Sequence, residues 1–180
     1  HRKYLILISL VIIISAGLLF FSNFSSLTSK AVTTHDNQHD PTVVAKFNYL
    51  VANANSACYG IRTVLSMSDN GRIMGSCCGP MILHTYAEQL EALKQYSYID
   101  KIPKDPYDVP VSQAKEFINY FKTIKLSPEQ QQVYEDAKKM SHEGGPCCCG
   151  DDYSETSCWR WQVYGGLAKY LITRFLQVVN

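Results

Sequence analysis

Hydrophobic positions divide the chain into one long apolar stretch and several shorter amphipathic segments. The stretch runs from Tyr4 to Phe21 with no charged residue among its eighteen, enough for a helix to cross a bilayer at about 1.5 Å per residue. Two basic residues precede it and the next is Lys30, which orients the N-terminus toward the cytoplasm and the rest outside. We expect residues 1–21 to be an uncleaved anchor; a cleaved signal peptide is the alternative.

The region after the anchor changes from polar to amphipathic. Residues 22–41 are rich in Ser, Thr and Asn, which predicts a flexible stalk. After Asp40-Pro41, a cap followed by a proline at the first helical position, apolar residues recur every three or four positions as far as Leu65. This spacing predicts one amphipathic helix that ends near Gly71 and carries Cys58 among its apolar residues.

The same three-four spacing predicts four further helices. The best marked begins at Ser127, where a capping Ser, a proline and a capping-box glutamine (Gln130) follow one another. No stretch alternates like a strand, so we expect an all-α fold: a transmembrane helix followed by a cysteine-rich bundle of about five helices over residues 42–180. The four helices are expected after Gly79-Pro80, from about Ser112, from Ser127 to Gly144, and from Trp159 towards the C-terminus.

Charge and motifs exclude several classes of function. Lys and Arg number 17 against 16 Asp and Glu, so no basic field indicates binding to nucleic acid. No serine-hydrolase, zinc-protease or paired-carboxylate pattern is present, and the sequence does not indicate an enzyme. The expected partners are membrane lipid, through Tyr4–Phe21, and a larger membrane protein complex.

The seven cysteines are the unusual feature of the composition. All but Cys58 flank turns rich in Gly and Pro, in two loops that lie between successive predicted helices and that an antiparallel bundle can bring to one end. Three interpretations stay open: disulfide staples in an oxidising compartment, a soft-metal site, and a redox thiol at Cys147 or Cys149. The six loop cysteines are Cys77, Cys78, Cys147, Cys148, Cys149 and Cys158.

The soft-metal interpretation is the one we favour, because contiguous thiolates concentrate sulfur around Cu(I) or Zn(II). The predicted ligands are the six loop cysteines. Weaker candidates are the neighbouring thioethers and imidazoles of Met74, Met81, His84 and His142. The alternative is a disulfide-stapled interaction module of a membrane complex.

Trp159-Arg160-Trp161, directly after Cys158, begins the last predicted helix. An amphipathic start would bury Trp161 and leave Arg160 outside. The functional alternative is that the two indoles shield a thiolate cluster from water or contact a partner.

The segment from Ser127 to Cys158 resembles a group of exported, membrane-attached proteins that carry a Pro-Cys-Tyr-Cys-Gly-Cys motif and have no established function. Here the run from Pro146 reads Pro-Cys-Cys-Cys-Gly-Asp, so Cys148 replaces the tyrosine and Asp151 the last cysteine. By this resemblance Cys147 and Cys149 match motif positions, and Cys158 would replace the third sulfur. The resemblance implies an exported location and a cysteine-centred site, and it implies no reaction.

Overall fold

The computed structural model describes residues 39–56, 60–77, 79–142 and 158–176. These ranges are mostly helical, as predicted, and also contain one small antiparallel sheet. None of their helices is both long enough and apolar enough to span a bilayer, and the predicted anchor over Tyr4–Phe21 lies outside the described residues. The elements are α2 (Pro41–Ala52), α3 (Ile61–Ser66), β1 (Arg72–Met74), α4 (Leu83–Lys94), β2 (Asp108–Pro110), α5 (Val111–Thr123), α6 (Pro128–His142) and α7 (Trp159–Phe175).

The first predicted helix begins as expected but ends early. The side chain of Asp40 accepts a hydrogen bond from Thr42 N at 2.8 Å, and Pro41 is the first helical residue. The helix then ends at Ala52, because Asn53 donates from its side chain to Tyr49 O at 2.8 Å. The prediction of one helix as far as Gly71 was therefore wrong.

The residues directly after α2, as far as Ser56, are held by β1. Asn55 accepts from Met74 N at 2.7 Å and donates from its side chain to Arg72 O at 2.9 Å. Its backbone N also donates to Met74 O at 3.1 Å. The side chain of Asn55 thus forms hydrogen bonds with backbone groups along the edge of the strand. A helix that continued past Ala52 would not form these bonds.

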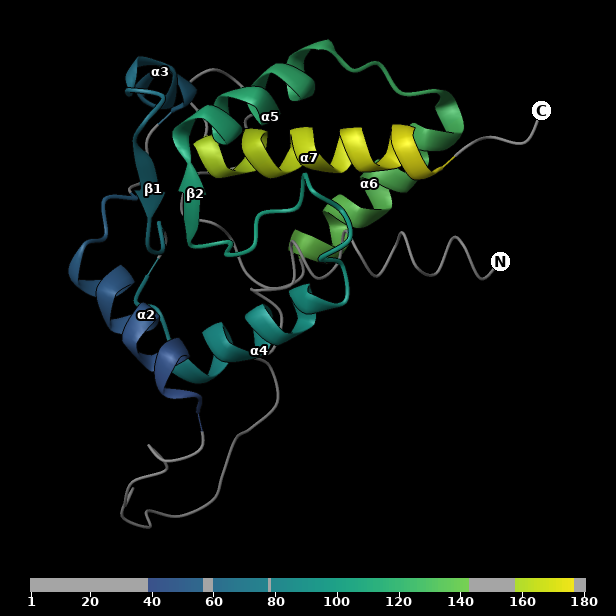
Figure 1. The fold of residues 1–180 in the computed structure, drawn as a ribbon. Helices are drawn as coiled ribbons and strands as arrows, with labels where there is room; N and C mark the ends of the chain where they lie inside the picture. Colours follow the sequence, from purple (N-terminus) through teal and green to yellow (C-terminus); the bar gives the residue numbers. More distant parts are fainter. Residues whose placement is uncertain (1–38, 57–59, 78, 143–157, 177–180) are drawn as a thin grey trace.

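The sheet was not predicted. β1 pairs with β2 in the register Ile73 to Val109, and both side chains are buried. Each strand has three residues, too few to show alternation in a sequence. The pairing brings together segments that α4 separates along the chain (Figure 1).

The main core lies where α5 packs along α7 (Figure 1). Phe117 and Ile118 are buried, as their spacing predicts, whereas Leu65, expected to face inward, is 42% exposed. Gly166 allows the close approach, because a Cβ there would lie 1.8 Å from Phe117 O. A second, smaller cluster joins α6 to α7 and consists of Tyr134, Ala137, Ala168, Ile172 and Leu176.

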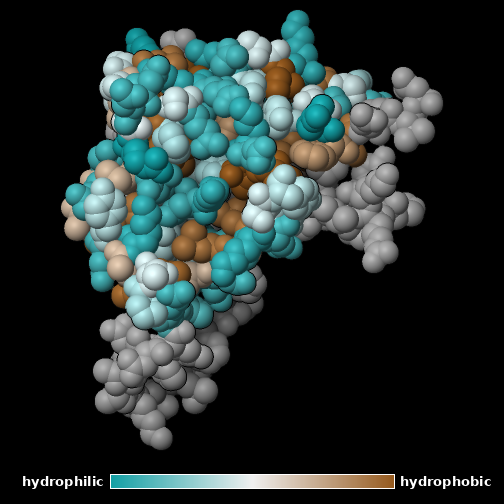
Figure 2. Space-filling view, in the orientation of Figure 1, coloured by the Kyte–Doolittle hydropathy of each residue, from teal (hydrophilic) through white to brown (hydrophobic). Residues whose placement is uncertain are grey.

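Figure 2 shows one face of the molecule that is largely hydrophilic, with apolar residues visible only in small areas among polar ones. On this face no broad apolar surface indicates a docking site. The described residues that carry distinctive chemistry are instead half-buried, at the junction of the sheet with the start of α7.

Candidate functional site

Cys77 and Arg160 meet at this junction although 83 positions separate them. Cys77 lies in the loop after β1, half-buried against the main core. Arg160 is in the first turn of α7 and donates from Nη1 to Sγ of Cys77 at 3.8 Å. The loop that carries Cys77 and Cys78 is therefore in contact with the helix that directly follows Cys158.

Aromatic rings and one carbonyl fix the guanidinium of Arg160. Its Cζ lies 5.0 Å from the centroid of the Tyr107 ring, 5.7 Å from that of Tyr164 and 5.9 Å from that of Trp159. Nη2 donates to Pro106 O at 2.8 Å, and the hydroxyl of Tyr164 donates to the same oxygen at 2.8 Å. The side chain is thus held from several directions.

The charge of Arg160 persists in this setting. Burial disfavours the cation, but Tyr164, Cys77 and Tyr107 outweigh it and raise the pKa of the guanidinium above its ordinary value. Among the described residues no carboxylate forms an ion pair with it. The junction therefore offers a fixed positive charge beside a sulfur atom.

The prediction for the start of α7 was wrong in detail. Trp159, rather than Trp161, is the fully buried indole, at 1% exposure, and Trp161 packs only partly against the core. Arg160 points toward Tyr107 and Cys77 instead of outward. The first residues of α7 are turned toward the sheet region, which spacing alone does not reveal.

The structure describes two of the six predicted cysteine ligands. Cys158 is the residue before α7 and is 1% exposed, in the same core against which Cys77 packs. These two cysteines are not joined to each other by a disulfide. The remaining cysteines, namely Cys58, Cys78, Cys147, Cys148 and Cys149, lie outside the described residues.

The weaker ligand candidates come from different segments of the fold. Met74 is in β1, and His84 is on α4 with a 71% exposed side chain, 3.2 Å from Glu88. Met81 lies half-buried before α4. The backbone of His142 ends α6, and its side chain is not among those described. Within the described ranges, no three His, Cys, Asp or Glu side chains lie close enough together to hold a metal ion.

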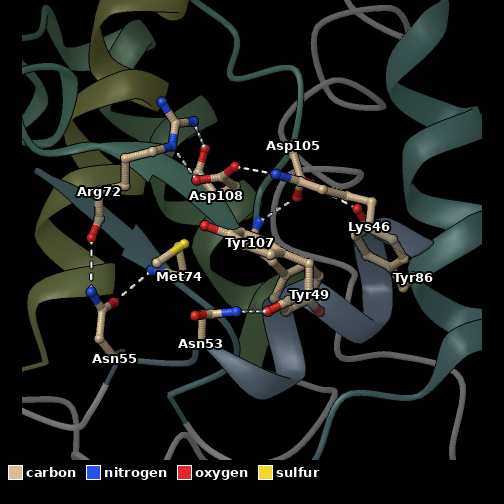
Figure 3. Close-up of polar contacts among 10 residues, drawn as sticks. All are labelled: Lys46, Tyr49, Asn53, Asn55, Arg72, Met74, Tyr86, Asp105, Tyr107 and Asp108. Carbon is tan, nitrogen blue, oxygen red and sulfur yellow. Dashed lines mark hydrogen bonds and ion pairs between the residues drawn. The ribbon is translucent and has the colours of Figure 1, made fainter. Parts of the chain in front are cut away.

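A polar network that the sequence did not predict lies beside this junction (Figure 3). The carboxylate of Asp108, 7% exposed, accepts from both Lys46 and Arg72. Burial pushes the pKa of Asp108 up, but the hydrogen bonds from Arg72 and Lys46 outweigh it, and the pKa lies below its ordinary value. Asp108 therefore joins α2 and β1 to β2 as an ionised group.

Asp105 behaves differently in the same network. It accepts from the hydroxyl of Tyr86 at 2.7 Å and from Tyr107 N at 2.8 Å. Burial dominates here and raises the pKa of Asp105 despite these two bonds. The buried hydroxyl of Tyr86 also has a raised pKa, first through burial and then through its bond to Asp105.

Residues 105–108 connect the network to the sulfur site. Asp105 and Asp108 bond toward α2, α4 and β1, whereas Pro106 O and the Tyr107 ring contact Arg160. Tyr107 O also accepts from Gly75 N at 2.9 Å, just before the loop of Cys77. These contacts leave no signal in the local sequence, because the partners of residues 105–108 come from distant parts of the chain.

Comparisons with known proteins add no identity: no protein-family model, curated protein or solved structure matches this chain. A function for this chain must therefore be inferred from the chemistry of its own residues.

Proposed function

We propose that this protein is a membrane-anchored, extracytoplasmic protein that binds a soft metal ion, copper or zinc, between its two cysteine-bearing loops. The observation that supports the proposal is the contact between Arg160 and Cys77, at 3.8 Å. It links the loop of Cys77 and Cys78 to the helix that follows Cys158, and the second loop leads directly into that helix.

Thiolate chemistry makes a soft metal the fitting ligand. Sulfur ligands prefer Cu(I) and Zn(II), and a cluster of thiolates accumulates negative charge that a nearby cation can balance. Arg160 supplies such a cation beside Cys77. The proposed ligands are Cys77, Cys78, Cys147, Cys148, Cys149 and Cys158.

The proposal includes an N-terminal anchor over Tyr4–Phe21, followed by the stalk over residues 22–41. Its support is the charge-free apolar length and the basic residues before it. Retention of the full chain in membranes after alkaline carbonate extraction tests this part, and release of the intact chain would contradict it.

Elemental analysis with thiol counting on one sample tests the metal site. The full chain, exported to an oxidising compartment and purified in detergent, should contain near-stoichiometric copper or zinc, with most thiols recovered once the metal is stripped. Cys77→Ser and Cys148→Ser, one from each loop, should each lower the metal content while the helical circular dichroism is retained. Cys58→Ser, outside the proposed ligand set, is the matched control.

A disulfide-stapled module is the second candidate, and the complete burial of Cys158 favours it. Staples would leave no metal and about one recoverable thiol, that of Cys58. Unfolding of Cys148→Ser, rather than loss of metal from a folded chain, would support the same alternative.

A further inference from the structure

The helix α2 presents an uncharged side to solvent. Its one charged residue, Lys46, lies on the inner side, where Nζ donates to the carboxylate of Asp108. Leu50 is fully buried, and the ring of Phe47 lies 5.9 Å from that of Tyr86 on α4, measured between centroids. The exposed residues of α2 after its first turn form what we call the outer face of α2: Ala45, Asn48, Tyr49, Val51 and Ala52.

Such a face is unusual for a helix in contact with water. A surface helix of a globular protein normally carries charged residues opposite its buried side, and α6 does so with Glu129, Asp136 and Lys139. In α2, by contrast, Tyr49 and Val51 are each 51% exposed. Figure 1 shows α2 at the edge of the fold, with α4 beside it. The described parts of the chain therefore leave the outer face of α2 open to a partner.

We propose that the outer face of α2 lies in the surface of the lipid bilayer that holds the N-terminal anchor. The inference rests on that anchor, which is part of the proposed function, and it does not require the metal site. Residues 22–40 connect Phe21, the end of the anchor, to Pro41, the first residue of α2. A linker of this length spans at most about 70 Å even when fully extended, so it keeps α2 at a high effective concentration near the bilayer.

The size and chemistry of this face favour lipid over a second copy of the chain. A helix of 12 residues is about 18 Å long and about 10 Å wide, whereas a stable protein interface buries about 800 Å² on each partner. The outer face is too small to hold a dimer by itself. Tyr49, with its ring and hydroxyl, suits the level of the lipid headgroups, and Val51 and Ala52 suit the start of the acyl chains. Because the five residues are uncharged, the contact requires no anionic lipid.

Tryptophan quenching by lipid tests the inference on the full chain. Tyr49→Trp places a reporter in the outer face, and Leu65→Trp, on α3, is the control because Leu65 is 42% exposed. Each variant is reconstituted in phosphatidylcholine vesicles with and without lipid brominated in the acyl chains near the headgroup, and the emission of the wild-type chain is subtracted. Brominated lipid should lower the added emission of Tyr49→Trp about twofold and change that of Leu65→Trp by less than about a tenth. Vesicles that also contain phosphatidylglycerol should give the same result.

A charge in the outer face should abolish the contact. Val51→Asp, added to Tyr49→Trp, should remove the quenching by brominated lipid, because an ionised carboxylate resists transfer out of water. Thr63→Asp, at an exposed position of α3, is the matched control and should leave the quenching unchanged. Helical circular dichroism verifies that each variant is folded, and Val51→Trp replaces Tyr49→Trp as the reporter if the latter does not fold.

The outcomes separate the inference from the anchor on which it rests. If alkaline carbonate releases the wild-type chain from the vesicles, the anchor fails and the inference fails with it. If the chain is retained but Tyr49→Trp is quenched no more than Leu65→Trp, the anchor stands and the inference is overturned. Quenching that requires phosphatidylglycerol would also overturn it, because charge would then hold the chain at the bilayer. So would an unquenched Tyr49→Trp whose emission shifts to shorter wavelength as the protein-to-lipid ratio rises, because a second copy would then cover the face.

Discussion

Two regions of the molecule are held together in different ways. In the first, Gly165 and Gly166 let α7 pack closely on α5. In the second, the carboxylate of Asp108 on β2 binds a lysine from α2 and an arginine from β1. A Cβ on Gly166 would lie 1.8 Å from Phe117 O, so the first region depends on shape. The second depends on the charge of Asp108 and its bonds to Lys46 and Arg72. The two regions are therefore sensitive to different changes: added volume disturbs one and lost charge disturbs the other.

The proposed site draws on both regions. Arg160 is carried by α7, whose position is set by packing on α5. Pro106 and Tyr107, which hold its guanidinium, belong to the segment that Asp105 and Asp108 anchor. The contact with Cys77 thus requires that a tightly packed helix pair and a polar network keep their relative position.

Gly166→Ala is expected to have the largest effect on stability. The new methyl group would meet the backbone of α5, with Phe117 C at 2.7 Å and Phe121 N at 2.9 Å, so the helices must separate. We expect a loss of about 3 kcal/mol, measured by chemical denaturation, despite the better helix propensity of alanine.

Gly165→Ala is the matched control for that variant. Its Cβ would meet the Tyr134 hydroxyl at 2.8 Å and the edge of the Phe121 ring at 2.9 Å, both on side chains that can shift. The loss should therefore be about 1 kcal/mol. Equal losses at the two positions would show that backbone contact does not control the packing of α5 on α7.

Asp108→Asn should have the next largest effect. The variant removes the negative charge of the carboxylate that accepts hydrogen bonds from Lys46 and Arg72. A hydrogen bond to a charged group contributes about 2 kcal/mol to stability. We expect a loss of about 2 kcal/mol, because both cations are partly exposed and regain water. Asp69→Asn, which breaks the exposed pair with Lys115, should change stability little. Equal effects would contradict a special role for Asp108.

Acid should abolish the difference between wild type and Asp108→Asn. Because the folded pKa of Asp108 lies below its ordinary 3.8, its stabilisation is complete above about pH 5 and is lost as pH falls through the folded pKa. The effect of pH on the contribution of Asp105 has the opposite sign. Burial raises its pKa, so its ionised form destabilises the folded state, and acidification removes this destabilisation. Denaturation of both proteins at a series of pH values from 7 into the acid range measures the change, and a difference that does not shrink as the pH falls below 3.8 would assign the effect of Asp108→Asn to packing.

The parts of the fold that neighbouring residues determine could be predicted from the sequence. Asp40 and Pro41 begin α2, and the spacing of Phe117 and Ile118 identifies the buried side of α5. The break after Ala52 was not predicted: Asn53 ends the helix locally, but what holds the following residues out of a helix is the bonding of Asn55 to a strand 17 residues away. Hydrophobic spacing describes one segment at a time, so contacts between segments leave no periodic signal.

The site was predicted only in part for the same reason. The sequence identified Cys77 and the Trp159-Arg160-Trp161 segment as chemically unusual, but it placed Arg160 outside. Its actual position depends on Tyr107 and Pro106, which come from the sheet region. A cation beside a sulfur 83 positions earlier has no signature in either local stretch.

Ser127→Ala is expected to have the smallest effect on stability, although the helix start at Ser127 is the one that the sequence marks best. Gln130 N donates to Ser127 Oγ at 3.3 Å, and Ser127 N donates to Gln130 Oε1 at 3.1 Å, so the predicted capping box is confirmed. Loss of the hydroxyl should cost about 1 kcal/mol, with Ser112→Ala, an exposed serine in the first turn of α5, as control. A loss as large as that of Gly166→Ala would mean that local caps, rather than contacts between distant segments, determine the stability of this fold.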